Sequence, residues 1–109
     1  MKQRVVRRSH AITWFVSRHP GAIEWAKGQN LAVDRWVAHL DPTDIYAGDT
    51  VIGSLPVNLA AAVCKRAARY LHLAIVVPAA LRGQELSTAD LQSLHAELKE
   101  FHIEETSNG

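Results

Sequence analysis

The segment AITWFVSRHPGAIEWAKGQN, residues 11–30, changes from a strand pattern to a helix pattern across one short turn. Residues 11–16 are apolar and rich in aromatic and β-branched side chains, which predicts a buried strand. Pro20 suits the first position of a helix, where its missing N–H would have no partner in any case. The run Gly28-Gln29-Asn30 is expected to end that helix. The segment therefore predicts a strand, a turn over residues 17–21 and a helix.

The same alternation continues along the chain. Apolar runs predict strands at 33–40, 50–54 and 71–77, and residues 100–105 predict a short polar edge strand. Helical spacing predicts two further helices. Their defining residues are a cap at Asn58 with the inner face Leu59, Val63, Ala67 and Tyr70, and a capping-box pair Ser87 and Asp90 with the stripe Leu91, Leu94 and Leu98.

This order of elements predicts an α/β fold: a mostly parallel sheet of about five strands with helices on both faces. The connection over residues 41–48 is the exception, because it is shorter than the dozen or so residues that a parallel crossover normally needs. Two explanations stay open. Either this connection is a short crossover, or one pair of strands is antiparallel.

The composition is typical of one soluble domain. The chain has 109 residues, with 12 basic and 11 acidic side chains and a single cysteine, Cys64. Four of the basic residues lie in the first eight positions, and without them 8 basic residues face 11 acidic ones, a net charge of −3. We therefore expect a basic, flexible extension at 1–10, a single domain at 11–109, and no binding to duplex nucleic acid. The lone cysteine, the lack of a long apolar run and the lack of a signal-peptide pattern predict a cytoplasmic protein with no membrane span.

Ligands of open parallel sheets bind beyond the carboxyl ends of the strands, where the strand order reverses. Four predicted turns end there, at residues 17–21, 39–41, 54–58 and 78–82. Arg18 and His19 precede a helix N-terminus, where backbone N–H groups attract anions, and a guanidinium can add a two-pronged contact to a phosphate. The turns thus predict a site for a ligand that bears phosphate.

The polar residues of these turns also have purely structural explanations. Ser17 and Asn58 can cap helices or bind a ligand, and His19 can support a turn or act in catalysis. His39 with Asp41 two residues later resembles a base with its orienting carboxylate only loosely. His72 is predicted to be a core histidine, and the three tryptophans are expected in the core rather than as a stacking platform. The spacing of the six histidines gives no convincing metal site.

Four stretches together resemble the small accessory proteins of type III CRISPR loci that are grouped with the ring nucleases. They are WFVSRHPGAIEWA at 14–26, VDRWVAHLDP at 33–42, GDTVIGSLPVNLAAAVC at 48–64 and YLHLAI at 70–75. The resemblance covers roughly residues 12–101 and implies a Rossmann-like fold related to CARF domains.

The resemblance also implies an activity. Ring nucleases linearise cyclic oligoadenylate, commonly cyclic tetra-adenylate, and so switch off type III CRISPR signalling. A homodimer typically binds the ring, and no metal or other cofactor is usually needed. The ribose 2′-hydroxyl attacks the adjacent phosphodiester and leaves a 2′,3′-cyclic phosphate. Arg18, His19 and His39 are then the candidate catalytic residues, and the candidate ligand-binding residues are Ser17, Pro20, Gly21, Asp41, Leu55, Pro56, Asn58 and Arg82.

Two other functions remain as alternatives. The same fold could bind cyclic oligoadenylate without cleaving it, because an active site based on positioning leaves little trace in a sequence. The sequence SRHPG also resembles the Arg-His-Gly turn of histidine phosphatases. Pro20 interrupts that motif, however, and those enzymes have a longer chain with a second matched histidine.

Overall fold

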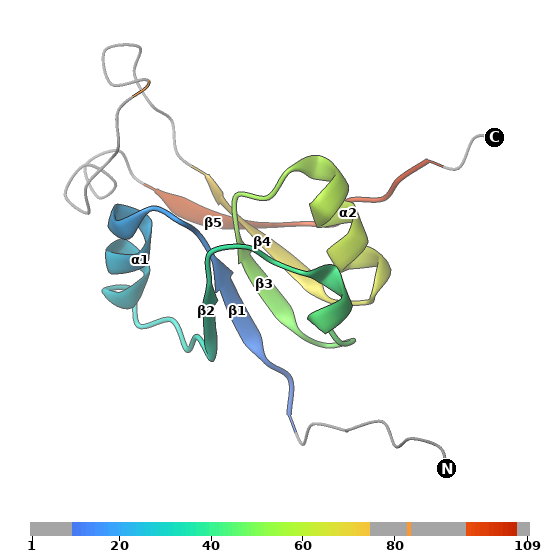
Figure 1. The fold of residues 1–109 in the computed structure, drawn as a ribbon, viewed down its shortest axis with the longest axis horizontal. Helices are drawn as coiled ribbons and strands as arrows, with labels where there is room; N and C mark the ends of the chain where they lie inside the picture. Colours follow the sequence, from blue (N-terminus) through green and yellow to red (C-terminus); the bar gives the residue numbers. More distant parts are fainter. Residues whose placement is uncertain (1–9, 75–82, 84–95, 107–109) are drawn as a thin grey trace.

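The computed structural model describes residues 10–74, 83 and 96–106, and it contains a five-stranded sheet in the order β2-β1-β3-β4-β5 (Figure 1). The strands β1 to β4 are parallel to one another, and β5 is antiparallel to β4. This confirms the predicted α/β fold with a mostly parallel sheet. The elements are β1 (Thr13–Val16), α1 (Pro20–Lys27), β2 (Arg35–Val37), the 3₁₀ helix η1 (Pro42–Asp44), β3 (Thr50–Gly53), α2 (Val57–Lys65), β4 (Arg69–Ala74) and β5 (Glu97–Phe101).

The connection between β2 and β3 is the short crossover that the sequence left open. The strand β1 lies between β2 and β3, so the chain passes across β1 through η1 before it enters β3. The antiparallel pair is β4 with β5 instead. The short crossover is therefore the correct explanation for this connection, and the antiparallel pair lies elsewhere in the sheet.

The first strand and helix form where the sequence predicts them. His19 is the N-cap of α1, Pro20 is its first residue, and Gly28 is its C-cap. Asn30 has a φ of 59°, a left-handed conformation that asparagine tolerates better than most residues. The local signals of this segment thus agree with its tertiary position.

The prediction for the second helix was wrong at both ends. Pro56, not Asn58, is the N-cap of α2, and it makes no side-chain capping bond. The helix ends at Lys65, because the chain turns through Ala67 with a left-handed φ of 66°. Tyr70 consequently lies in β4 rather than on the helix. The buried residues of α2 are Ala60, Val63 and Cys64.

The C-terminal strand begins earlier than predicted. The structure assigns β5 to Glu97–Phe101, and its exposed side chains agree with the predicted polar edge strand. Leu98 belongs to this strand and not to a helical stripe. The predicted helix signals Ser87, Asp90, Leu91 and Leu94 lie outside the described residues.

Alternate residues of the strands belong to two separate hydrophobic clusters. Trp14 and Val16 pack with Val63 of α2, and Phe15, which lies between them in sequence, packs with residues of α1. Because successive side chains of a strand point to opposite faces, the two clusters occupy opposite faces of the sheet. Of the three tryptophans, Trp14 and Trp25 are buried as predicted, whereas Trp36 on the edge strand β2 remains 38% exposed.

A buried carboxylate joins the amino ends of β1 and β3. Asp49 is 1% exposed and accepts hydrogen bonds from the backbone N–H of Ile12 at 3.0 Å and of Tyr46 at 3.0 Å. It also accepts one from the indole N–H of Trp14 at 3.2 Å. Asp49 thus ties the loop before β3 to the start of β1, a role that no sequence pattern predicted.

Candidate functional site

The strand order reverses between β1 and β3. After β1 the chain passes through α1 to β2 on one side, and after β3 it passes through α2 to β4 on the other. Val16 and Gly53 are register partners at the carboxyl ends of these two strands, so the β1–α1 turn and the β3–α2 turn begin side by side. A Cβ atom on Gly53 would lie 2.7 Å from the carbonyl oxygen of Val16, so this close approach requires glycine. The reversal is the place where open parallel sheets bind their ligands.

The β1–α1 turn presents two exposed cationic or titratable side chains. The backbone N–H of Ser17 donates to the carbonyl oxygen of Val37 at 3.0 Å, which holds the start of the turn against β2. The Ser17 hydroxyl accepts a hydrogen bond from the backbone N–H of His19 at 3.0 Å. Ser17 therefore closes the turn before the helix instead of capping it. The side chains of Arg18, His19 and Pro20 are exposed at this edge, and Gly21 is half-buried.

Asp41, which with His39 resembled a base and its orienting carboxylate only loosely, has a structural role in the folded chain. Asp41 accepts hydrogen bonds from the backbone N–H of Thr43 at 3.0 Å and from its hydroxyl at 2.7 Å, which caps η1. These bonds hold the pKa of Asp41 below its usual value, and the charge of Arg66 lowers this pKa further. His39 is exposed and lies two residues after the end of β2, the strand that pairs with β1. Asp41 is thus engaged by Thr43, and His39 follows β2, whose Val37 carbonyl accepts the backbone N–H of Ser17.

Two hydrogen bonds with residues of β4 hold the β3–α2 turn. The Ser54 hydroxyl donates to the carbonyl oxygen of Leu73 at 3.0 Å. The backbone N–H of Leu55 donates to the Tyr70 hydroxyl at 2.9 Å. Leu55 is half-buried, whereas Pro56 and Asn58 are exposed. Because both anchors come from β4, this turn has a defined position relative to the strand reversal.

Tyr70 and His72 adjoin this turn, and sequence analysis assigned them no functional role. The Tyr70 hydroxyl lies 3.2 Å from the carbonyl oxygen of Gly53 and 2.6 Å from Nδ1 of His72. Burial raises the pKa of Tyr70, and the hydrogen bond from Leu55 opposes this effect. His72 is half-buried rather than a fully buried core residue. The spacing of two residues in a strand was the available signal, because it places both side chains on one face.

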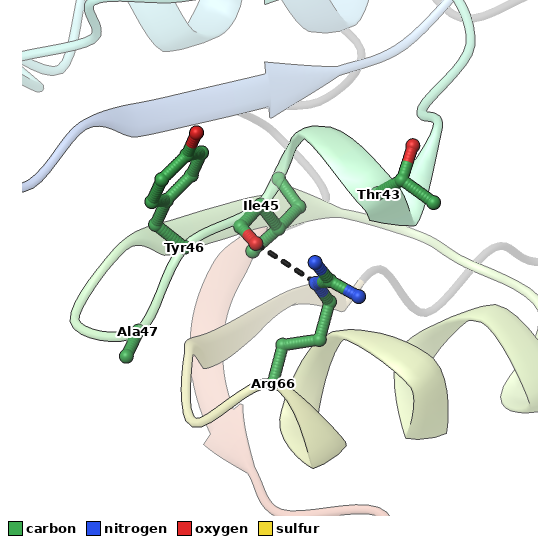
Figure 2. Close-up of a pocket in the computed structure, with 5 residues that line it drawn as sticks. All are labelled: Thr43, Ile45, Tyr46, Ala47 and Arg66. Atoms are coloured by element: carbon green, nitrogen blue, oxygen red, sulfur yellow. Dashed lines mark hydrogen bonds between the residues drawn. The ribbon is translucent and has the colours of Figure 1, made fainter. Parts of the chain in front are cut away.

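Two cavities in the described part of the chain lie away from Arg18 and His19. The first has a volume of about 490 Å³ and is lined by Thr43, Ile45, Tyr46, Ala47 and Arg66. Figure 2 shows the Arg66 side chain in this cavity, where its Nε donates to the carbonyl oxygen of Ile45 at 2.9 Å. The guanidinium of Arg66 is therefore already engaged by a backbone carbonyl.

The second cavity, of about 700 Å³, lies between α2 and the segment after β5. Asn58 lines it together with Lys65, and residues 102–106 form the other wall. Among the predicted site residues, Asn58 is the one that lines either of these two cavities. Asn58 therefore borders this groove as well as the β3–α2 turn.

Three remaining sequence predictions concern the turn at 78–82, a metal site and a membrane span. Arg82 and the turn at 78–82 belong to the residues that are not described. Within residues 10–74, 83 and 96–106, no three His, Cys, Asp or Glu side chains are grouped closely enough to hold a metal ion. None of the helices in this part of the chain is long and apolar enough to cross a membrane.

Comparison with known proteins places the chain in a family. No curated protein and no solved structure matches the chain. Residues 14–104 match the family described as "Putative CRISPR-associated protein (Cas_VVA1548)". The matched range contains β1 except for Thr13, and all of α1, the strand reversal and β5. Since the match covers most of the sequence, the chain belongs to this family of CRISPR-associated proteins.

Proposed function

We propose that this protein is a ring nuclease that binds and linearises cyclic oligoadenylate, with cyclic tetra-adenylate as the expected substrate. The observation that carries the proposal is the position of Arg18 and His19, which are exposed in the turn beside the strand reversal. Membership of a CRISPR-associated family supports this choice of ligand over other phosphate-bearing molecules. The resemblance of the sequence to ring nucleases supplies the expected reaction.

In the proposed reaction, a ribose 2′-oxygen forms a bond to the adjacent phosphorus while the bond from phosphorus to the 5′-oxygen breaks. The proton of the 2′-hydroxyl passes to a base, for which His19 and His39 are the candidates. The departing 5′-oxygen takes up a proton from water. Arg18 stabilises the charge that develops on the phosphate oxygens. The turn contributes to the rate chiefly by holding the 2′-oxygen, the phosphorus and the leaving oxygen in line.

A homodimer is part of the proposal. Cyclic tetra-adenylate has two-fold symmetry, and one copy of this small domain offers one β1–α1 turn. Two copies related by a two-fold axis would present Arg18 and His19 twice to the same ring. Light scattering should therefore give the mass of a dimer in the presence of the ligand, and a strict monomer with and without ligand would contradict the symmetry argument.

The function is tested by incubating the pure protein, in EDTA, with cyclic tri-, tetra- and hexa-adenylate. Mass spectrometry should then detect linear adenylates that end in a 2′,3′-cyclic phosphate. Tight binding without any cleavage would favour the non-catalytic binding module. Neither binding nor cleavage of any of the three rings would overturn the proposal.

A further inference from the structure

A histidine lies in the last row of residues that the strands share at the reversal. Register pairing defines this row, which consists of Val37, Val16, Gly53, His72 and Lys99. The titratable side chains of the row are His72 and Lys99, and the amine of Lys99 lies 3.5 Å from the carboxylate of Glu97. His72 is the register partner of Gly53, the residue directly before the β3–α2 turn. His72 is therefore level with the end of β3.

The ring of His72 is held on two sides. Its Nδ1 lies 2.6 Å from the Tyr70 hydroxyl, and its ring meets Phe101 edge-on at a centroid distance of 5.9 Å. Tyr70 is itself 2% exposed and fixed by the packing of the core beneath α2. An imidazole with these two contacts has little freedom to rotate. The orientation of its second nitrogen is thus set by the fold.

The hydrogen bonds around Tyr70 indicate which nitrogen of His72 carries the proton. The Tyr70 oxygen accepts the backbone N–H of Leu55, and its single O–H can donate to Nδ1 of His72 at 2.6 Å or to the carbonyl oxygen of Gly53 at 3.2 Å. A distance of 2.6 Å lies in the usual range for an O–H donor and below that for an N–H donor, which favours donation from Tyr70 to His72. Burial raises the pKa of Tyr70, which keeps this proton on the phenol. A neutral imidazole that accepts at Nδ1 carries its hydrogen on Nε2.

We propose that His72 is a further binding residue of the site at the strand reversal, where Nε2–H donates a hydrogen bond to a phosphate oxygen of the ligand. Tyr70 is the positioning residue that orients the imidazole. This inference rests on the proposed function, because the phosphate is that of the cyclic oligoadenylate. In the described part of the chain, the hydrogen bond of the His72 ring is the one at Nδ1, and the ring is half-buried, so Nε2 is the nitrogen left for a ligand.

The decisive variants are His72→Asn and His72→Gln. An asparagine amide can take the place of Nδ1, so His72→Asn should keep the contact with Tyr70 and lose the donor to the ligand. A glutamine amide reaches the place of Nε2, so His72→Gln should restore part of the activity. We expect His72→Asn to cleave cyclic tetra-adenylate about 100-fold or more slowly, the loss that is typical of one donor to a developing phosphate charge.

The matched control is His102→Asn. His102 is also a histidine of the C-terminal half, but it is exposed and its Nε2 lies 3.8 Å from the Glu104 carboxylate. This substitution should leave the cleavage rate unchanged. Tyr70→Phe should lower the rate by up to about 100-fold through misorientation of His72. In the Tyr70→Phe variant, the ¹⁵N spectrum of the His72 imidazole should no longer show the Nε2–H form as the dominant one.

The ¹⁵N spectrum also gives a readout that needs no activity. In the wild-type protein, His72 should be in the Nε2–H form, and its Nε2 signal should move when cyclic tetra-adenylate is added. A wild-type rate in His72→Asn, or a His72 signal that ignores the bound ligand, would overturn this inference and leave the proposed function standing. A wild-type protein that neither binds nor cleaves cyclic adenylates would overturn the proposed function, and this inference with it. If the protein binds cyclic tetra-adenylate without cleaving it, the affinity replaces the rate as the criterion. Weaker binding by His72→Asn then supports the inference, and wild-type affinity overturns it.

Discussion

The buried carboxylate of Asp49 should be one of the strongest single determinants of stability in this protein. Its two oxygens accept at least three N–H groups, from Ile12, Trp14 and Tyr46, in a site that is closed to water. The substitution Asp49→Asn keeps the shape of the side chain and replaces one of these oxygens with an NH₂ group. In either orientation of the amide, at least one buried N–H then faces another donor.

The expected cost follows from that arrangement. One buried donor without an acceptor costs about 1–3 kcal/mol. The remaining hydrogen bonds also lose the assistance of the negative charge, which makes them weaker by about 1 kcal/mol each. The neutral amide is easier to bury than a carboxylate, and this offsets part of the loss. We therefore expect Asp49→Asn to lower the free energy of unfolding by about 2 kcal/mol or more.

Asp34→Asn is the matched control, because the Asp34 carboxylate accepts the backbone N–H of Thr13 at 2.9 Å on the exposed side of the same strand. There an amide oxygen or water can replace the carboxylate, and the cost should stay below about 1 kcal/mol. Urea denaturation measures both free energies, provided that the slope with urea is unchanged. Equal losses in the two variants would refute the argument that burial and the number of N–H donors determine the effect.

Three further predictions concern the site and the sheet. Arg18→Ala should fold normally, since its side chain is exposed, and should lower the cleavage of cyclic tetra-adenylate by about 100- to 1,000-fold; near-wild-type cleavage by the Arg18→Ala, His19→Ala double variant would remove this turn from the mechanism. Gly53→Ala should destabilise the protein by about 1–3 kcal/mol, because its Cβ would lie 2.7 Å from a carbonyl oxygen of β1, and an unchanged melting temperature would contradict this. The hydrogen bond from Arg69 holds the pKa of Glu100 below its usual value. The pair should therefore stabilise the folded protein slightly at pH values above the pKa that Glu100 has in the unfolded chain. This stabilisation is lost as the pH falls through the pKa of Glu100 in the folded protein. In a plot of the unfolding midpoint against pH, Glu100→Gln should flatten the curve in this acidic range.

The sequence by itself determined the elements whose signals are local. The strand β1 follows from an apolar run of aromatic and β-branched residues, and α1 follows from Pro20 at its start and Gly28 at its end. The alternation of strands and helices was enough to predict a mostly parallel sheet. The same alternation places the turns at 17–21 and 54–58 at one edge of the sheet, because the carboxyl ends of parallel strands all lie at the same edge. This part of the candidate site was therefore predictable.

Only the tertiary structure decided which of these turns meet and which side chains they hold. Helical spacing extended α2 as far as Tyr70, but the left-handed turn at Ala67 ends the helix and delivers Tyr70 to β4, where its hydroxyl reaches the β3–α2 turn. His39 and Asp41 resembled a base with its orienting carboxylate only loosely, and in the structure Asp41 caps η1 by accepting the backbone N–H and the hydroxyl of Thr43. The strand order and the buried role of Asp49 were equally out of reach. Apart from the local cap at Asp41, these features depend on contacts between residues distant in sequence, whose energies come from burial and hydrogen bonding in the folded chain and leave no periodic pattern in the amino-acid sequence.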